Sequence, residues 1–388
     1  LFRSRCINTS VKIFYMKKRS LLILCVFTTL MACAQNPKEV KEDDVPISVS
    51  EAYGYETIVA DLINPWGMAF LPDGSLLITE KSGELIHFKD GVKQEISGVP
   101  EVYNRGQGGL LDIQLSPNYA EDGFIYITYS STQGDGKGGN TALMRAKLSG
   151  PTLTGQEVLY KATPNTTKGQ HWGSRIVFDD AGHVFFTAGE RDINPQDITR
   201  DNGKVYRLNL DGSIPSDNPF VNTADAKGAI WSYGHRNPQG MIVNPETNEI
   251  WVHEHGPRGG DEINVIKKGA NYGWPVITYG INYSGTEITD ETQKEGMEQP
   301  LYYWVPSIAP SGMAFVSSDT YPELKGNILV GSLKFVYLEA LYLNDANEVI
   351  KREKLLDGIG RVRNVIEGPD GFIYVGVEGV GIVKLVKN

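Results

Sequence analysis

The 388-residue sequence predicts an all-β fold arranged as a six-bladed propeller, and two observations lead to that prediction. One theme repeats along the chain: a short apolar strand, a turn rich in Pro, Asp and Gly, and a second strand of alternating β-formers. Six copies are present, and they begin near Gly67, Leu110, Ser174, Gly240, Gly312 and Arg363. In addition, 43 glycines and 19 tyrosines suit tight turns and aromatic strand faces, and no convincing helical pattern exceeds two turns.

The clearest copy covers residues 67–79 (GMAFLPDGSLLIT), where Pro72, Asp73 and Gly74 form a turn between two apolar strands. An Asp-Gly pair between such strands is typical of a β-hairpin. The copies are separated by roughly 40–75 residues, as in propellers whose blades carry loops of unequal length. Residues 55–62 form an extra strand before the first copy. We expect it to pair into the last blade, because closing the ring removes free sheet edges. A β-sandwich would need fewer strands and would lack this period.

The composition restricts the class of partner. The chain is 40% hydrophobic and 22% charged, which is ample material for a core. Its formal net charge of −10 gives a nucleic-acid-binding role no electrostatic basis and also disfavours a polyanionic substrate. A small anion could still be bound by a local cluster of arginines. All three cysteines, Cys6, Cys25 and Cys33, lie near the N-terminus, so we expect no disulfide in the globular part.

Residues 1–34 are predicted to be an export leader, with residues 1–15 as an upstream extension and Met16 as the true start. Met16 is followed by three basic residues and by the apolar run 21–31, which is short for a membrane span. Two cleavage patterns fit this leader. The tetrapeptide LMAC, which ends in Cys33, resembles a bacterial lipobox, in which the cysteine becomes lipidated. Ala32 and Ala34 also satisfy the small-residue rule of ordinary signal cleavage.

We favour lipidation, because Cys33 otherwise has no purpose at that position. Either pattern predicts export to the bacterial periplasm or cell envelope, with a lipid anchor as the only attachment to a membrane. Residues 35–54 are rich in charged residues and are predicted to form a flexible tether. Residues 55–388 then form the propeller domain.

Polar residues that no turn requires are concentrated in six loop segments. These segments are residues 105–109 (RGQGG), 169–173 (GQHWG), 234–240 (GHRNPQG), 253–262 (HEHGPRGGDE), 331–334 (GSLK) and 360–363 (GRVR). Each lies just before the first strand of a blade or just after the second strand. These positions meet at one face of a propeller, so we expect the six segments to surround one end of the channel.

Several motifs in these segments resemble the glucose/sorbosone dehydrogenase family, which comprises the soluble quinoprotein aldose sugar dehydrogenases. The similar motifs are GQGGLLD, QHWGSRIVF, GHRNPQGM, HEHGP followed by DEINVI, NYGWP, PSIAPSGMAF, GSLK and GRVRNVIEGPDG, in order from about Asn64 to the C-terminus. The resemblance implies a six-bladed propeller that oxidises aldoses at C1 to lactones, using pyrroloquinoline quinone (PQQ) and Ca²⁺. No CxxCH haem motif is present, so a separate electron acceptor is expected.

The resemblance also implies roles for the polar loop residues. His171 would be the general base, since imidazole suits proton transfer near neutral pH. Arg236 and Asn237 would lie at the quinone carbonyls, where a cationic donor stabilises the charge that develops as hydride arrives. The cofactor carboxylates would be bound by Lys334, Arg361 and Arg363. Without the resemblance, His171 could be a structural histidine, Arg236 an interblade arginine and each of the other cations a solvated charge.

Metal-binding positions follow from the same resemblance. The backbone carbonyls of Gly256 and Pro257 would hold the Ca²⁺ that polarises the cofactor. Glu262 and the loop around Tyr272 correspond to a second, structural calcium site in some members. His253 and His255 alternate along one strand and could instead bind a transition metal, but that alternative needs a third ligand.

The substrate side of the site departs from the family pattern. Gln107 and Glu190 correspond to positions that line the sugar and cofactor pocket, and Glu190 stands where some members have an aspartate. Gln170 stands where the best-known members carry an aspartate that contacts the sugar. This change removes a charge beside the base and leaves the preferred aldose open.

Two other functions remain compatible with a propeller. A calcium-dependent lactonase or related hydrolase would hold its metal with carboxylates and asparagines at the centre of the channel, and it would not need Lys334, Arg361 and Arg363. A non-catalytic propeller that binds a carbohydrate or a protein would not need His171 together with the set of cations.

Overall fold

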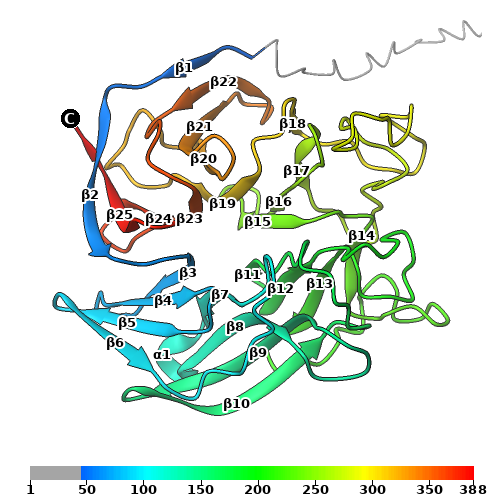
Figure 1. The fold of residues 1–388 in the computed structure, drawn as a ribbon, viewed down its shortest axis with the longest axis horizontal. Helices are drawn as coiled ribbons and strands as arrows, with labels where there is room; N and C mark the ends of the chain where they lie inside the picture. Colours follow the sequence, from blue (N-terminus) through cyan, green and yellow to red (C-terminus); the bar gives the residue numbers. More distant parts are fainter. Residues whose placement is uncertain (1–44) are drawn as a thin grey trace, which may run out of the picture. The chain divides into compact units, whose positions relative to one another are not determined.

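The strands form six sheets that follow one another around a ring, in the computed structural model of this protein, and almost all neighbouring strands are antiparallel (Figure 1). The structure describes residues 45–388, so the predicted leader and residues 35–44 of the predicted tether lie outside the described residues. Within each sheet, successive strands pair from the centre of the ring outward. The innermost strands β3, β7, β11, β15, β19 and β23 contact one another in sequence, and β23 contacts β3. The six-bladed propeller predicted from the repeats is therefore confirmed.

The first three blades each use four consecutive strands. Blade 1 consists of β3 (Pro65–Phe70), β4 (Leu76–Glu80), β5 (Leu85–Lys89) and β6 (Val92–Ile96). Blade 2 consists of β7 (Leu110–Leu115), β8 (Phe124–Ser131), β9 (Asn140–Ser149) and β10 (Thr152–Lys161), with the one-turn helix α1 (Tyr119–Asp122) between β7 and β8. Blade 3 consists of β11 (Ile176–Phe178), β12 (His183–Ala188), β13 (Lys204–Asn209) and β14 (Ile230–Tyr233).

The other three blades complete the ring. Blade 4 consists of β15 (Pro238–Val243), β16 (Ile250–Glu254), β17 (Asp261–Val265) and β18 (Tyr302–Trp304). Blade 5 consists of β19 (Pro310–Phe315), β20 (Ile328–Ser332), β21 (Tyr337–Leu343) and β22 (Val349–Lys354). Blade 6 consists of β23 (Val362–Glu367), β24 (Ile373–Val377), β25 (Gly381–Lys387) and, as its outer strand, β2 (Tyr53–Ala60).

Strand β2 closes the ring as the sequence predicts. It pairs antiparallel with β25, with Tyr53 opposite Lys387 and Ala60 opposite Gly381 (Figure 1). The observed strand begins two residues before the predicted range 55–62. Joining the two ends of the chain in one sheet covers edges that would otherwise be free to pair with other chains.

The end of the predicted tether is ordered, which differs from the expectation for residues 35–54. Strand β1 (Ile47–Val49) pairs in parallel with the outer strand β22, and the Arg352 backbone amide donates to the Pro46 carbonyl at 3.0 Å. Val45 is buried among the apolar side chains of blades 4 and 5. Charge composition predicted a flexible segment, but the unpaired edge of β22 supplies backbone partners for residues 46–50.

The core consists of apolar clusters between neighbouring blades. Each interface between adjacent blades has its own buried cluster, such as Tyr126 and Leu143 of blade 2 against Ile176 and Phe186 of blade 3. The other five interfaces are filled in the same way. Burial of this apolar surface, at about 25 cal/mol per Å², is the main force that holds the blades together. No helix among residues 45–388 is long and apolar enough to cross a membrane.

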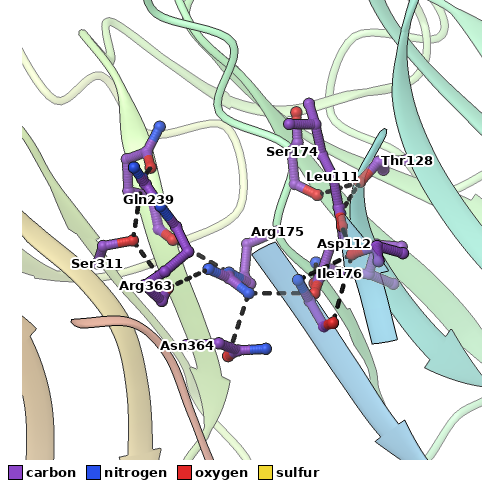
Figure 2. Close-up of polar contacts among 12 residues, drawn as sticks. Leu111, Asp112, Thr128, Ser174, Arg175, Ile176, Gln239, Ser311, Arg363 and Asn364 are labelled. Atoms are coloured by element: carbon purple, nitrogen blue, oxygen red, sulfur yellow. Dashed lines mark hydrogen bonds and ion pairs between the residues drawn. The ribbon is translucent and has the colours of Figure 1, made fainter. Parts of the chain in front are cut away.

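The centre of the ring contains a buried arginine (Figure 2). Arg175, at the start of β11, donates to the Asp112 carboxylate at 3.1 Å and to Asn364 Oδ1 at 3.3 Å. It also donates to the carbonyls of Gln239 at 3.1 Å and Arg363 at 3.3 Å. Its guanidinium lies 4.2 Å from the ring centroid of Trp66. One side chain of blade 3 thus contacts residues of blades 1, 2, 4 and 6.

Replacing Arg175 with Leu should lower the free energy of unfolding by about 3–5 kcal/mol, because the buried Asp112 carboxylate would lose its charged partner. Urea denaturation followed by tryptophan fluorescence measures this change. The double variant Arg175→Leu/Asp112→Leu should recover part of the loss. As a control, Lys325→Ala removes an exposed ion pair with Asp319 and should leave the midpoint unchanged. If Arg175→Leu were as stable as the parent, the central ion pair would not be a stabilising element.

Candidate active site

The polar loop segments meet at one face of the propeller and are hydrogen-bonded to one another. Blades 1 and 2 are linked by Lys81 Nζ, which donates to the Gly106 carbonyl at 3.2 Å. Blades 4 and 5 are linked by His255 Nε2 and the Pro310 carbonyl, 2.6 Å apart. Blades 5 and 6 are linked by Arg361, which donates to the Leu333 carbonyl at 2.9 Å. The convergence expected from the positions of these segments is therefore observed.

His171 lies in this face and is oriented by two side chains. Its Nδ1 is hydrogen-bonded to Glu190 Oε1, and its backbone amide donates to Gln107 Oε1 at 2.8 Å. Because an ionised carboxylate only accepts hydrogen bonds, this contact places the proton of a neutral imidazole on Nδ1. Nε2 is then the basic atom. The structure thus brings together His171, Glu190 and Gln107, three residues that were predicted to share one pocket.

Burial lowers the pKa of His171, and the hydrogen bond to Glu190 opposes that shift only in part. The imidazole is therefore neutral, and able to accept a proton, at pH 7. Its backbone has a positive φ of 58°, which is uncommon for a residue with a side chain. A side chain at Gly189 would overlap the His171 carbonyl, so this close approach requires glycine. Strained backbone of this kind is concentrated at functional sites.

Arg191 holds the loop of the base in place, although the sequence gave no sign of this role. Its guanidinium is stacked on Trp172, 3.5 Å from the ring centroid. It donates hydrogen bonds to the carbonyls of Gln170 and Lys168, which both shortly precede the base in sequence. The side chain is fully buried, so the predicted substrate residue Gln170 and the base share one rigid support.

Arg236 lies between the base and the loop at residues 255–257. The Glu190 backbone amide donates to the Arg236 carbonyl at 2.9 Å, and Arg236 Nη1 donates to the carbonyls of His255 and Gly256, both at 2.9 Å. Its Nε is buried and has no hydrogen-bond partner within residues 45–388. A buried donor without a partner lowers the stability of the folded protein. We therefore expect this N–H group to donate to an acceptor atom of a bound molecule.

Asn237 is fully buried and links two loops of the site. Its Oδ1 accepts from the Gly173 amide at 3.2 Å, and its Nδ2 lies 3.4 Å from His255 Nδ1. In this structure its side chain therefore joins the loop of the base to the loop of Gly256, which is a structural function in addition to the one implied by the resemblance.

The predicted anion-binding cations lie on blades 5 and 6 and differ in exposure. The side chain of Arg361 is 47% exposed, whereas that of Arg363 is only 9% exposed. Lys334 is exposed, with its Nζ 4.8 Å from the ring centroid of Phe335. Arg363 also donates to Gln239 Oε1 at 3.3 Å, towards the channel. Arg361 and Lys334 are thus the accessible cations of the set.

Glu378, which follows β24, pairs with both arginines and was not found from the sequence. Its Oε2 accepts from Arg361 Nε at 2.7 Å, and its Oε1 accepts from Arg363. Burial alone would raise the pKa of Glu378, but the two arginines outweigh burial and hold this pKa below its ordinary value. The carboxylate is therefore ionised and fixes the orientation of both guanidinium groups. Glu378 lies immediately after the second strand of its blade, and some of the predicted polar loop segments occupy the same position in their blades.

A small cavity next to Arg236 contains two neighbouring carboxylates. Glu254 and Glu262 lie directly opposite each other on β16 and β17. Burial and then the Glu254 charge raise the pKa of Glu262 well above its ordinary value. Gly256 and Tyr272 also line this cavity of about 10 Å³, which is close to the smallest volume that holds one water or ion. This set of oxygen donors suits a hard cation such as Ca²⁺.

The Gly256 loop is fixed by a buried aspartate. The Asp261 carboxylate accepts from the Gly256 amide at 2.8 Å, from the Ala309 amide at 2.8 Å and from the Ser307 hydroxyl at 2.6 Å. Burial raises the pKa of Asp261 to about 6. These bonds hold the backbone of residues 256 and 257 in one orientation, which a site made of carbonyl ligands requires.

The transition-metal alternative at His253 and His255 is not supported. Neither residue belongs to a group of three His, Cys, Asp or Glu side chains with closely spaced ligand atoms, anywhere in the described part of the chain. The His253 ring is fully buried, and it fits only because position 240 is a glycine. Burial lowers the pKa of His253 to about 3, so the ring is neutral.

The arrangement combines a neutral, oriented imidazole with accessible cations and an unpaired buried donor on one polar face. It can remove a proton from a substrate hydroxyl and bind an anionic cofactor nearby.

Comparison with known proteins agrees with this chemistry. The family model of glucose/sorbosone dehydrogenase matches residues 62–384. Aldose sugar dehydrogenase YliI of Escherichia coli (strain K12) is 44% identical over 330 residues, covering 82% of this chain and 88% of that protein. Quinoprotein glucose dehydrogenase B of Acinetobacter calcoaceticus is 29% identical over 456 residues, covering 95% of this chain and 94% of that protein.

Solved structures show the same fold. The apo-form of the soluble aldose sugar dehydrogenase of Escherichia coli superposes with a TM-score of 0.82 at 40% identity, covering 87% of this chain and all of that chain. The PQQ-bound form of the aldose sugar dehydrogenase of Streptomyces coelicolor superposes with a TM-score of 0.69 at 26% identity, covering 88% of this chain. The resemblance found in the sequence motifs is confirmed: the chain belongs to the glucose/sorbosone dehydrogenase family.

Proposed function

We propose that this protein oxidises aldose sugars at C1 to lactones, with His171 as the general base, PQQ as the hydride acceptor and Ca²⁺ as its activating ion. The observation that carries the proposal is the neutral imidazole of His171, held by Glu190 on the face where the accessible cations lie. A family member from Streptomyces coelicolor has been solved with PQQ bound, which supports the choice of cofactor.

His171 would take the proton of the C1 hydroxyl on Nε2 while the C1–H bond breaks and the carbonyl forms. Glu190, which accepts the Nδ1–H, would stabilise the imidazolium that results. Gln107 would keep the ring in place through the backbone amide of His171. Since burial lowers the pKa of His171, the base is free to accept a proton over the whole neutral range.

The cofactor would be held by the cations of blades 4, 5 and 6. PQQ carries three carboxylates and supplies an electron-accepting quinone. Arg361 and Lys334 are exposed for charge-assisted bonds to carboxylates, and Arg236 offers its unpaired Nε to a carbonyl or carboxylate oxygen. Arg363 and Glu378 would orient Arg361 from behind.

Calcium would be bound by the Gly256 and Pro257 carbonyls. The Gly256 carbonyl already accepts one hydrogen bond from Arg236, but a carbonyl oxygen has a second lone pair for an ion. A second calcium ion would suit the cavity between Glu254 and Glu262, where it would neutralise two adjacent carboxylates.

A hydrolase propeller with its metal at the centre of the channel is a poorer fit. In this chain the Arg175 guanidinium lies among the innermost strands, where it would repel a metal ion, and no carboxylate of residues 45–388 lines the cavity beside it. No contact among the described residues favours a non-catalytic binding propeller.

We also propose that the protein is exported to the periplasm or cell envelope of a bacterium and transfers its electrons to a separate acceptor. These inferences rest on the leader pattern at residues 16–33 and on the absence of a CxxCH motif from the sequence. We further propose lipidation at Cys33, because the lipobox-like tetrapeptide LMAC favours it over ordinary cleavage.

His171→Gln should reduce turnover by roughly 10²–10⁴-fold, the usual contribution of a general base, while PQQ and Ca²⁺ still bind. The measurement is reduction of dichlorophenolindophenol by protein reconstituted with PQQ and Ca²⁺ in the presence of an aldose. His87→Gln, on blade 1, is the matched control and should keep parental activity. Near-normal turnover of His171→Gln would refute the assignment of the base.

The pH profile of kcat/KM should show an acidic limb below pH ~6.5, the ordinary pKa of histidine, because the pKa of His171 is lowered. Activity should fall as the pH drops through this pKa, since the protonated ring cannot accept a proton. The limb should be absent in His171→Gln. A limb above pH 7 would mean that a different group titrates.

Arg361→Gln should weaken PQQ binding by about 10- to 150-fold, which corresponds to about 1.5–3 kcal/mol for one charge-assisted hydrogen bond. Titration of the apoprotein with PQQ, followed by absorbance or fluorescence, gives the dissociation constant. Lys325→Gln, an exposed cation elsewhere on blade 5, serves as the control. An unchanged constant in Arg361→Gln would remove this arginine from the cofactor site.

Saturating Ca²⁺ should stabilise the apoprotein, by about 2.7 kcal/mol when its concentration is 100 times the dissociation constant. Part of that gain should disappear in Glu262→Gln, which loses one carboxylate of the cavity. Thermal melting with Ca²⁺, with Zn²⁺ and with a chelator measures the effect. Equal stabilisation by Zn²⁺ alone would argue against a site built from oxygen ligands.

A further inference from the structure

A second carboxylate, Asp192, lies beside the base, and the proton transfer proposed above does not use it. Its carboxylate oxygen, a ring nitrogen of His171 and a carboxylate oxygen of Glu190 all lie within 4.8 Å of one another. The two carboxylates differ in access: the Glu190 side chain is 8% exposed and that of Asp192 is 40% exposed. Asp192 is therefore the carboxylate beside the base that a dissolved molecule can reach.

The backbone turns sharply to place Asp192 there. Arg191 and Asp192 both have positive φ, 54° and 58°, immediately after Glu190. Such conformations cost free energy and persist only where the surroundings enforce them. The buried Arg191 guanidinium on Trp172 supplies that constraint. The position of the Asp192 carboxylate is thus fixed by the fold.

Two side chains of the preceding loop contact Asp192. Lys168 Nζ lies 2.7 Å from its Oδ2, and the Gln170 side chain also donates a hydrogen bond to its carboxylate. Partial burial would raise the pKa of Asp192, but these two hydrogen bonds outweigh it and hold the pKa below its ordinary value. The carboxylate is therefore ionised at neutral pH.

Asp192 and Lys168 both have hydrogen-bonding capacity that their present contacts do not use. An ionised carboxylate has about four acceptor positions, and Lys168 and Gln170 occupy two of them. An ammonium group has three donors, and the Lys168 side chain is 54% exposed, so it can donate to another oxygen. Neighbouring hydroxyls of a sugar need both kinds of partner, since each hydroxyl donates once and also accepts.

We propose that Asp192 and Lys168 form the sugar-recognition pair of this site. Asp192 accepts a hydrogen bond from the hydroxyl at C2 while His171 acts on the hydroxyl at C1, and Lys168 donates to an adjacent sugar oxygen. Asp192 thereby supplies the negative charge that Gln170 lacks on the substrate side. The inference rests on the proposed function, since it assumes an aldose with C1 at His171.

The short distances among the side chains of His171, Glu190 and Asp192 determine which sugar hydroxyl Asp192 can recognise. Because an Asp192 oxygen lies within 4.8 Å of one ring nitrogen of His171, one sugar can contact both residues only through hydroxyls that are near each other. An aldose without the C2 hydroxyl should therefore gain nothing from Asp192. The pair acts on binding and on selectivity, whereas His171 acts on the rate of the chemical step.

Asp192→Asn in the protein reconstituted with PQQ and Ca²⁺ tests the inference, with D-glucose and 2-deoxy-D-glucose as substrates. Asparagine tolerates positive φ, so the backbone is preserved. The KM for glucose should rise by roughly 10- to 100-fold, with kcat within about 3-fold of the parent, because a charge-assisted hydrogen bond is lost. The KM for 2-deoxyglucose should hardly change, so selectivity between the two sugars should collapse.

Asp225→Asn is the matched control, because Asp225 is exposed and has a φ of 62° on a different loop of blade 3. It should leave both KM values unchanged, and PQQ affinity and melting temperature should be unchanged in both variants. If Asp192→Asn kept the parental KM and selectivity, or lowered kcat at constant KM, the recognition role would be overturned.

Direct binding separates this inference from the proposed function. Glucose binding, measured by isothermal titration calorimetry, should be weakened in Asp192→Asn whether or not turnover occurs. If the parent protein oxidised no aldose, the proposed function would fail, yet glucose binding that depended on Asp192 would still support the pair. Binding of glucose with equal affinity to both proteins would overturn it.

Discussion

The Arg175 guanidinium at the centre of the channel is the interaction on which the geometry of the site depends. It is hydrogen-bonded to residues of blades 2, 4 and 6 (Figure 2). It also lies over the ring of Trp66 in blade 1, so the innermost strands cannot shift independently. Its contact with the Arg363 carbonyl continues through the Arg363 side chain to Glu378 and from there to Arg361. The central cation is thus connected, through buried polar contacts, to the cations that we assign to the cofactor.

The site itself is built from loops, and its rigidity comes from buried polar side chains under those loops. Arg191 fixes the loop that carries His171 and Asp192, and Asp261 fixes the loop at Gly256. Asn237 joins the two loops. Catalytic loops on a rigid scaffold combine precise positions with an open face for ligands. The positive φ values at His171, Arg191 and Asp192 indicate that packing enforces these positions.

The charges of the site are arranged in two groups, although the protein as a whole is acidic. Arg361 and Lys334 on blades 5 and 6 attract an anion, whereas Glu190 and Asp192 lie near the base. Under the proposed function, this separation would place the cofactor on one side and the sugar on the other. Fixed charges that point to the atoms where charge develops in the transition state stabilise it more strongly in a partly buried site than they would in water.

The sequence by itself determined the propeller, because the repeated strand-turn-strand pattern and its Asp-Gly turns are local signals that need no knowledge of distant contacts. Through motif resemblance it also predicted functional roles for His171, Arg236 and the cations of blades 5 and 6. Only the tertiary structure revealed the contacts of Arg175, Glu378, Arg191 and Asp192. Their partners are distant in sequence, as with Arg175 and Asn364, which are 189 residues apart, or lie in loops whose turns no periodic pattern describes. The order of residues 45–54 was likewise decided by the outer edges of β22 and β25, which exist only once blades 5 and 6 have folded.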